Sequence, residues 1–513
     1  TSQAIDNDLS KARQLRDEVS ENRPPVEFVE TNVNRVFPSL YKNYKNVNQH
    51  PVGEVVLANN TNLPIRDAQM TFYISDFMDA PTEQDMKPLV GYSNTVINLK
   101  AVFNKKILEN SEDNTYQVTL KLTYRNEGEE KTIEKNIEIR VLGRNKITWK
   151  DKSRLAAFIA TESEEIIDYT KRIDVLYRDL PDYDLNDNIL KAVQVYTTLN
   201  RNNFVYSVDP ETKYSLVSTN TNILDFLQYP TETLKRKGGD CDDLVTVMCS
   251  LLEHSGINTA YIDVPGHVFM AFDSGIKPSE LDEHGLKHEE VIIQNNKVWI
   301  PIETTLLGSK NFMTSWKSAA ERFNKEQQAG NFPELVTLSN AREIYTPSSY
   351  TPQEYAPDFP QGDTLSSEYK QQLQSLFARK TAQKQEKLEQ RRAEKPNNIY
   401  VRNQLATIYA KADNLQKAKE ILEESLVITQ ENATIHNNLG NVEYRMANYK
   451  KALEHYQKAA ELDPEDGEIL VNISKAYVEL EDRKKAYEKF TEAISLNKKL
   501  AEKYRYLNEQ INQ

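Results

Sequence analysis

The segment Lys237–Leu244 (KGGDCDDL) places a cysteine where it could act as a nucleophile. The two glycines predict a tight turn, and the apolar run Val245–Leu252 predicts a helix that begins at Cys241. Asp240 can cap this helix, with Asp243 reaching back to the cap. The helix dipole lowers the pKa of a thiol at this position, whereas the neighbouring aspartates raise it. Activation of Cys241 is therefore expected to come chiefly from an imidazole.

His267 and Glu303 could complete such a site. His267 follows a Pro-Gly turn at the start of an apolar run, and Glu303 follows the strand-like run Val298–Ile302. Adjacent antiparallel strands would bring the two side chains together. The acid would then hold the imidazole in the tautomer that accepts the thiol proton.

Three motifs carry a resemblance to a known family: Gly-Asp-Cys-Asp-Asp-Leu, Gly-His-Val-Phe and Trp-Ile-Pro-Ile-Glu-Thr-Thr. Together they resemble the transglutaminase-like (papain-related) cysteine enzyme superfamily over about residues 150–320. The resemblance implies that Cys241 is the nucleophile, His267 the general base and Glu303 the orienting acid, where the superfamily usually has Asp. It also implies that Tyr206 helps to stabilise the oxyanion. Gln228 and the backbone N–H of Cys241 are further candidate donors.

The chain around these motifs predicts a multidomain protein. Residues 1–25 are expected to form an N-terminal helix, and residues 148–343 an α+β transglutaminase-like core with helices first and an antiparallel sheet after. Residues 26–147 predict an antiparallel, immunoglobulin-like β-sandwich. The strand-like runs of that region are Gly53–Leu57, Ala68–Ile74, Thr95–Phe103, Thr115–Tyr124 and Lys131–Leu142.

Residues 395–513 form a repeat array. Leu405-Ala406, Leu439-Gly440 and Ile473-Ser474 recur with a period of 34 residues, as do Ala418, Ala452 and Ala486. This period and these small residues resemble the tetratricopeptide repeat, so we expect an all-α solenoid of three repeats with a capping helix. Residues 344–394 predict a Pro-rich linker followed by a charged helix. Bacterial members of the resembling superfamily combine its core with such repeats.

The composition limits other classes of function. With 77 acidic and 64 basic residues the net charge is −13, so the chain has no electrostatic footprint for nucleic acid. Two cysteines leave no disulfide framework and no cysteine zinc cluster, and no metal or organic cofactor is implied. His284 and His288 have a spacing that could bind a metal on a helix, but Gly285 favours a charged loop. The longest apolar run, Val245–Leu252, is far shorter than the ~20 residues of a membrane span.

These features predict thiol-dependent acyl transfer on a protein or peptide amide. Water would resolve the thioester in a peptidase or amidase, and an amine would resolve it in a cross-linking enzyme. The repeats are expected to bind a protein partner. The alternative is a non-catalytic scaffold that binds peptides through an enzyme-like core. The resemblance implies a bacterial cell-envelope protein, periplasmic or secreted, and a chain that begins at Thr1 agrees with a removed signal or lipoprotein segment and equally with a trimmed start.

Overall fold

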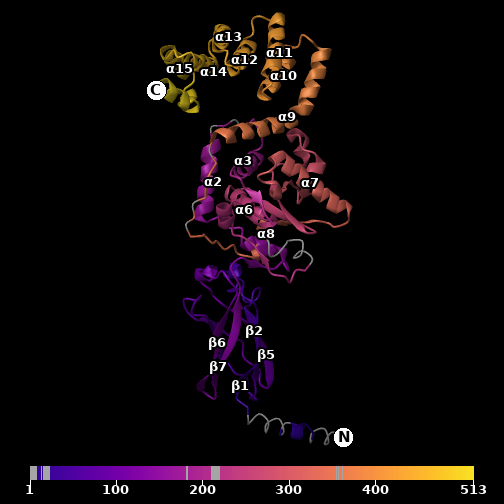
Figure 1. Ribbon diagram of the computed structural model, residues 1–513, viewed down its shortest axis with the longest axis vertical. Coiled ribbons are helices and arrows are strands. Elements are labelled where there is room, and N and C mark those ends of the chain that lie inside the picture. The colour runs from indigo at the N-terminus through magenta and orange to yellow at the C-terminus, as the bar shows by residue number, and fades with distance from the viewer. Residues whose placement is uncertain are drawn as a thin grey trace. The chain divides into compact units, whose positions relative to one another are not determined.

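The computed structural model describes residues 8–12, 14, 23–178, 180, 183–208, 220–353, 355, 357–360 and 362–512. The chain divides into two compact units, which we describe separately (Figure 1). Unit 1 comprises Thr1–Asp179, Lys191–Gly275 and Glu289–Leu365, and unit 2 comprises Leu180–Leu190, Ile276–His288 and Ser366–Gln513. Of the helix predicted over residues 1–25, residues 8–12 and 14 are helical, and the remaining positions up to residue 22 lie outside the described residues.

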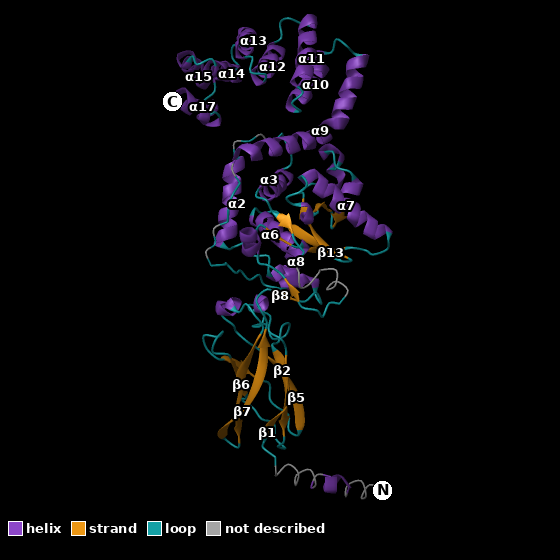
Figure 2. Cartoon of the chain, in the orientation of Figure 1, coloured by secondary structure: helices purple, strands orange, loops and turns teal. Residues whose placement is uncertain are grey.

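Two antiparallel sheets form the N-terminal part of unit 1 (Figure 2), as the predicted fold class requires. One sheet has the strand order β1-β2-β5 and the other has the order β4-β3-β6-β7. In β6 the buried residues Val118, Leu120 and Leu122 alternate with more exposed ones, which explains why the sequence revealed this strand. The bounds are β1 (Val26–Val33), β2 (Gly53–Asn59), β3 (Gln69–Tyr73), β4 (Thr82–Asp85), β5 (Ser93–Leu99), β6 (Asn114–Asn126) and β7 (Glu129–Val141).

Two of these strands, β1 and β4, were not predicted. Both lie at the edge of their sheet and bury few side chains, so they lack the apolar alternation of a central strand. The short strand β8 (Lys146–Ile147) then pairs with β10 (Asp225–Phe226) and joins the sheet region to the rest of unit 1.

The core of unit 1 is an antiparallel sheet of five strands in the order β14-β15-β13-β12-β16, with helices packed on it. Helix α6 lies against β12 and β13, and α7 lies against β15. Helices α2 to α6 precede the antiparallel strands, as predicted, whereas α7 and α8 follow β15 and were not predicted. The strands are β12 (Thr259–Val264), β13 (His267–Asp273), β14 (Ile292–Gln294), β15 (Lys297–Ile302) and β16 (Glu334–Thr337). The helices are α2 (Glu164–Tyr177), α3 (Asp187–Arg201), α5 (Pro230–Arg236), α6 (Cys241–His254), α7 (Phe312–Gln328) and α8 (Leu338–Ile344).

The predicted Pro-rich linker is bound to unit 1 instead of spanning open solvent. We call the described residues between 345 and 360 the strap. Its backbone carbonyls accept hydrogen bonds from unit 1: Pro347 from Lys42 Nζ and Gln353 from Lys235 Nζ, both at 2.7 Å. Ser348 is fully buried and donates from its backbone N–H to Ala157. Composition could predict the irregular backbone but not these partners, which lie far away in the sequence.

Unit 2 is helical and contains the repeat array. Helix α9 leads into the three predicted helix pairs, and two short closing helices, α16 and α17, follow where one capping helix was expected. Ala418, Ala452 and Ala486 are fully buried, and Gly440 lies against the ring of Tyr456. None of the described helices has the length and apolar character needed to cross a membrane. The bounds are α9 (Gly362–Glu394), α10 (Ile399–Lys411), α11 (Leu415–Ile428), α12 (Ala433–Arg445), α13 (Tyr449–Leu462), α14 (Gly467–Glu479), α15 (Arg483–Leu496), α16 (Lys499–Lys503) and α17 (Arg505–Asn512).

The close approach at Gly440 gives a test of the repeat packing. A Cβ atom added there would lie 2.5 Å from Cδ1 of Tyr456, whose ring is buried. Ala is the better helix former by about 1 kcal/mol, but overpacking typically costs ~1–3 kcal/mol. We expect Gly440→Ala to lower the free energy of unfolding and to speed amide exchange in α12 and α13, measured by hydrogen-exchange mass spectrometry. The exposed control Lys450→Ala should leave exchange unchanged, and slower exchange in Gly440→Ala would contradict the packing.

Candidate active site

A short turn holds Cys241 at the first position of α6. Gly238 and Gly239 form β11, which pairs in parallel with β9 (Val205–Tyr206), and Asp240 is the N-cap of the helix. Asp243 completes the predicted capping box. A Cβ atom on Gly239 would lie 2.4 Å from Oδ2 of Asp243, so the cap requires glycine at this position.

The carboxyl group of Asp243 binds the segment before α5 to this turn. Its Oδ1 accepts from the backbone N–H of Gln228 at 2.7 Å, and its Oδ2 accepts from Gln228 Nε2 at 2.5 Å and from the backbone N–H of Asp240 at 3.2 Å. Gln228 Nε2 also contacts the carbonyl oxygen of Gly238 at 3.4 Å. Gln228 thus supports the turn that carries Cys241, and its role as an oxyanion donor stays a prediction.

Cys241 is almost completely buried, with 2% of its surface exposed. The backbone N–H of Val268, the neighbour of His267, donates to its sulfur. Burial raises the pKa of the Cys241 thiol well above its usual value, and the carboxyl groups of Asp240 and Glu303 raise it further. The position at a helix N-terminus does not reverse this, so the resting side chain is a neutral thiol that needs a base.

His267 and Glu303 lie side by side, as expected for adjacent antiparallel strands. His267 begins β13, Glu303 follows β15, and these strands are antiparallel neighbours. His267 Nε2 donates to Glu303 Oε2 at 2.7 Å, and both residues are buried. Because an ionised carboxylate can only accept, this hydrogen bond places a proton on Nε2 and leaves Nδ1 as the acceptor nitrogen of the ring.

Glu303 is held in its ionised form. Burial alone would raise its pKa, but the hydrogen bonds from His267 and Thr305 outweigh that effect and lower the pKa of the carboxyl group. Oε1 of Glu303 accepts from Thr305 Oγ1 at 2.6 Å and from the Thr305 backbone N–H at 3.2 Å. Thr305, the second of the two threonines after Glu303 in the sequence motif, therefore orients the acid. The sequence reading had given that residue no part in the site.

Tyr206 lies on the rim of the same site. It is opposite Gly239 in the pairing of β9 with β11, and 43% of its surface is exposed. Burial raises the pKa of its phenol, and the nearby Cys241 and Asp240 raise it further. Its phenol therefore lies within electrostatic range of Cys241, while its role at the oxyanion stays a prediction.

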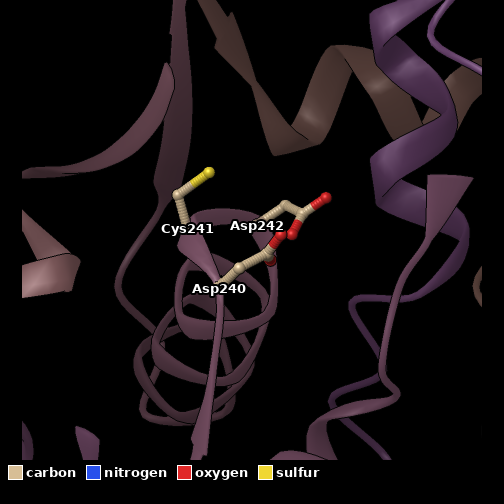
Figure 3. Close-up of side chains that lie close together, drawn as sticks. All are labelled: Asp240, Cys241 and Asp242. Carbon is tan, nitrogen blue, oxygen red and sulfur yellow. The ribbon is translucent and has the colours of Figure 1, made fainter. Parts of the chain in front are cut away.

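A cluster of buried carboxyl groups beneath Cys241 was missed by the sequence reading. Figure 3 shows the carboxyl groups of Asp240 and Asp242 directed toward each other, with the Cys241 sulfur on another side. The ligand atoms of these three residues lie within 4.8 Å of one another. Asp225 lies close by and accepts from Trp149 Nε1 at 2.7 Å. The sequence shows the run of aspartates, but only the fold reveals that they are buried together with Asp225.

Burial raises the pKa values of two carboxyl groups here. With Asp240 adding to it, burial raises the pKa of Asp242 well above its usual value and raises the pKa of Asp243 to about 8. A side-chain hydrogen bond with Asp240 adds to the rise at Asp242. The ligand atoms of Asp240, Cys241 and Asp242 also lie close enough together to hold a metal ion.

Two other candidates from the sequence lie away from the site. Cys249, the second cysteine of the chain, is fully buried in α6 and burial raises its pKa to about 12, so it is a core residue. His284 and His288 lie in separate short turns, Asp282–His284 and His288–Glu290, with Gly285 in the left-handed conformation between them. The helical metal-binding spacing considered for this pair is therefore absent in these described residues.

The buried carboxyl groups give unit 1 a defined pH dependence. Unfolded aspartate has a pKa of about 3.9, whereas Asp243 has about 8 when folded, so the folded chain binds more protons between these values. The free energy of unfolding should therefore fall as the pH rises from about 4 to about 8. Asp242→Asn removes one titrating group, and we expect a shallower fall and a more stable protein at the alkaline end.

Tryptophan fluorescence in urea measures this effect, because Trp149, Trp299 and Trp316 all lie in unit 1. The control is Asp76→Asn, which changes an exposed aspartate of the same unit and should keep the wild-type slope. Equal slopes for wild type and Asp242→Asn would contradict the protonated cluster.

Comparisons with known proteins bear on the C-terminal repeats. Residues 433–466 and 467–500 each match the tetratricopeptide repeat family. No curated protein matches the chain. One similar solved structure is MamA, with 17% identity over 28% of this chain and 86% of that chain and a TM-score of 0.22. Another is MamA 41-end from Desulfovibrio magneticus RS-1, with 22% identity, a TM-score of 0.20, and coverage of 25% of this chain and 67% of that chain. A third is the first TPR of Spaghetti (RPAP3) bound to HSP90 peptide SRMEEVD. It has 13% identity and a TM-score of 0.21, and the match covers 22% of this chain and 94% of that chain. The residues matched by the family show that the C-terminal array is built of tetratricopeptide repeats.

Proposed function

We propose that the chain is a thiol-dependent acyl-transfer enzyme that acts on a protein or peptide amide. The observation that carries this proposal is the buried hydrogen bond of 2.7 Å between His267 and Glu303, next to the helix start that presents Cys241. A nucleophile, a base and a group that orients the base are the parts such chemistry needs. The resemblance of the three motifs to the transglutaminase-like superfamily assigns the same roles to the same residues.

The proposed reaction uses the neutral thiol and the neutral imidazole. His267 Nδ1 takes the proton of Cys241 as the sulfur attacks the amide carbonyl carbon. The C–N bond then breaks, and the imidazolium returns the proton to the leaving amine. Water or a second amine attacks the thioester, His267 takes a proton from it, and the thiol is released with that proton. Glu303 stabilises the imidazolium at both stages.

Electrostatics make the base essential in this scheme. Asp240 and Glu303 oppose a free thiolate at Cys241, so thiolate should not accumulate in the resting enzyme. Proton transfer to His267 and attack on the carbonyl must then occur together. The backbone N–H of Cys241 and the phenol of Tyr206 are the candidate donors to the oxyanion.

A second candidate function is a non-catalytic peptide-binding scaffold with an enzyme-like core. The observation that favours it is the neutral thiol of Cys241, of which only 2% is exposed. In this case Cys241 and His267 would contribute only packing and hydrogen bonds. Peptide binding would then persist without turnover, and it would not depend on the thiol.

Incubation of the full chain with a peptide mixture and a primary amine, followed by mass spectrometry, distinguishes these functions. We expect cleaved or amine-modified peptides with the wild type. Cys241→Ala and His267→Ala should each lower the rate by about 10³-fold or more, and the double variant should lose no more than either one, since the residues act as a unit. Glu303→Gln, which changes the hydrogen bond to His267, should lower the rate by up to about 10⁴-fold.

Cys249→Ala is the matched control, because it removes the other thiol on the same helix. It should retain activity. Turnover that survives in Cys241→Ala would contradict the proposed nucleophile. A wild type without turnover that binds peptides as tightly as Cys241→Ala would support the scaffold.

The repeats are proposed to recruit a protein partner through a groove in unit 2. The groove has a volume of about 720 Å³ and lies between α9, α10 and the segment 282–283. Phe377, Leu388 and Ile408 form its apolar floor. Concave apolar surfaces of this kind are the usual binding faces of helical repeats.

The charge of this groove favours an acidic partner. Lys384, Lys387 and Arg391 line it from α9, and none of these cations has a carboxylate within salt-bridge distance in the described part of the chain. Asp184, Asp282 and Glu283 also line the groove. Lys411 pairs with Asp184, and the five basic lining residues outnumber the three acidic ones. An acidic segment with apolar side chains would match both the cations and the floor.

A fluorescein-labelled amphipathic peptide with Glu on one face and Leu on the other should bind this groove, measured by fluorescence anisotropy. The double variant Lys384→Glu/Lys387→Glu should bind it about tenfold more weakly, and salt should weaken wild-type binding, because the contacts are electrostatic. Lys458→Glu on α13 is the control. Equal binding of a peptide with Lys in place of Glu, or preferential binding of a single-stranded oligonucleotide, would contradict the proposal.

The cell-envelope location belongs to the same proposal and rests on the resemblance. Recovery of the native protein in the cytosolic fraction of its cell would contradict it.

A further inference from the structure

A second polar cavity lies in unit 1, away from Cys241. It has a volume of about 280 Å³ and is lined by residues of the segments 34–51 and 148–154. Four of its lining residues can carry positive charge: Arg35, His50, Lys150 and Arg154. None of the residues given as its lining is acidic. This balance is opposite to that of the whole chain, in which acidic residues outnumber basic ones.

Arg154 is the central cation of this cavity. Its guanidinium lies 5.2 Å from the centre of the Phe37 ring, and Nη1 donates to Thr148 Oγ1. Its Nε atom is buried and has no hydrogen-bond partner. A buried N–H without an acceptor costs about 1–3 kcal/mol, so a stable fold that keeps one has an acceptor still to be supplied.

Arg154 also forms a side-chain hydrogen bond with Tyr345, but the cations of the cavity have no carboxylate partner of their own in the described part of the chain. In the described part of the chain, no carboxylate lies within 4.0 Å of the charged nitrogens of Arg35, Lys150 or Arg154. Asp151 adjoins Lys150, but its oxygens accept from the backbone N–H of Ser153 and from Tyr345 Oη, each at 2.9 Å. Unpaired cations around one cavity repel each other, and a bound anion would remove that cost.

His50 adds a group whose orientation is fixed. Its Nε2 lies 3.1 Å from the carbonyl oxygen of Ile344, so Nε2 donates and Nδ1 is the remaining ring nitrogen. The ring also contacts Tyr345, with 5.1 Å between the ring centres. His50 and Asn43, which donates to the same carbonyl at 2.8 Å, connect the sheet region to the end of α8. The cavity therefore lies where these two parts of unit 1 meet.

We propose that this cavity binds the phosphate group of a small phosphorylated ligand. Guanidinium groups match phosphate oxygens with paired N–H donors, and Lys150 adds a point charge. The volume of about 280 Å³ lies just below the range of about 300–1,000 Å³ for drug-sized ligands, which suits a phosphate on a compact body. Phe37, Leu40 and Tyr44 supply buried walls for that body. Because both parts of unit 1 contribute to the cavity, the ligand would also stabilise their junction.

Calorimetry and thermal unfolding of the full chain test this proposal, with inorganic phosphate, glycerol 3-phosphate and glycerol as probes at constant ionic strength. Both phosphates should bind and raise the Tm of unit 1, read from tryptophan fluorescence, because a ligand of the folded state shifts unfolding by mass action. Glycerol should have no effect. Tighter binding of glycerol 3-phosphate would assign the site to a phosphate ester, and equal binding would assign it to free phosphate.

Arg154→Gln should weaken phosphate binding about tenfold or more, and Lys150→Gln, on an exposed side chain, should weaken it about threefold to tenfold. The control is Arg140→Gln, because Arg140 is already paired with Asp113 at 2.7 Å on the sheet region. If Arg154→Gln fails to fold, the phosphate affinity of Lys150→Gln tests the proposal in its place. The proposal is overturned if chloride at equal ionic strength stabilises the chain as much as phosphate, or if Lys150→Gln binds phosphate as tightly as the control.

Discussion

The start of α6 depends on one buried carboxyl group, that of Asp243. It accepts three hydrogen bonds, two of them from Gln228 and one from the backbone of Asp240, and so binds the segment before α5 to the first turn of the helix. The turn also requires glycine at position 239, because the carboxyl group of Asp243 occupies the space that a Cβ atom would need. Cys241 has its position because of this contact. The sheet then supplies His267 and Glu303 from two neighbouring strands, so the site combines one helix start with one strand pair.

The same cap sets the electrostatic character of the site. Carboxyl groups that accept from backbone N–H groups at this helix start lie close to the thiol. Burial raises the pKa values of Asp242 and Asp243, and the carboxyl groups of Asp240 and Glu303 raise the pKa of the Cys241 thiol. A cysteine protein that relies on a preformed thiolate needs positive surroundings, and Cys241 has the opposite. The reactivity proposed for Cys241 therefore depends on His267. The hydrogen bond from His267 to Glu303 fixes the orientation of the ring that this proposal needs.

The sequence could predict the parts of this protein that follow a short-range pattern. The alternation in β6, the glycines and cap before Cys241 and the period of the repeats each depend on neighbours in the chain, and all appear in the fold. Asp225 joins the carboxyl cluster, and Thr305 orients Glu303, for reasons that only tertiary contacts supply. The cavity around Arg154 is a further case, since its cations come from segments more than one hundred residues apart in sequence. Edge strands such as β1 escaped prediction because they bury too little to leave a pattern.

The strap shows how a proline-rich segment can be recognised. Proline has no backbone N–H, so such a segment is poor in donors but keeps every carbonyl oxygen. Side chains elsewhere in unit 1 donate hydrogen bonds to four of those oxygens. The donor and acceptor pairs are Lys42 with Pro347, Thr231 with Tyr350, Lys235 with Gln353, and Asn202 with Asp358. Three strap side chains add to these main-chain contacts: Ser348 Oγ donates to the carbonyl of Ala157, Arg144 lies over the ring of Tyr350, and Asp358 accepts from Lys237. Positions of the strap that offer only a carbonyl oxygen are therefore the ones that can be substituted without loosening it.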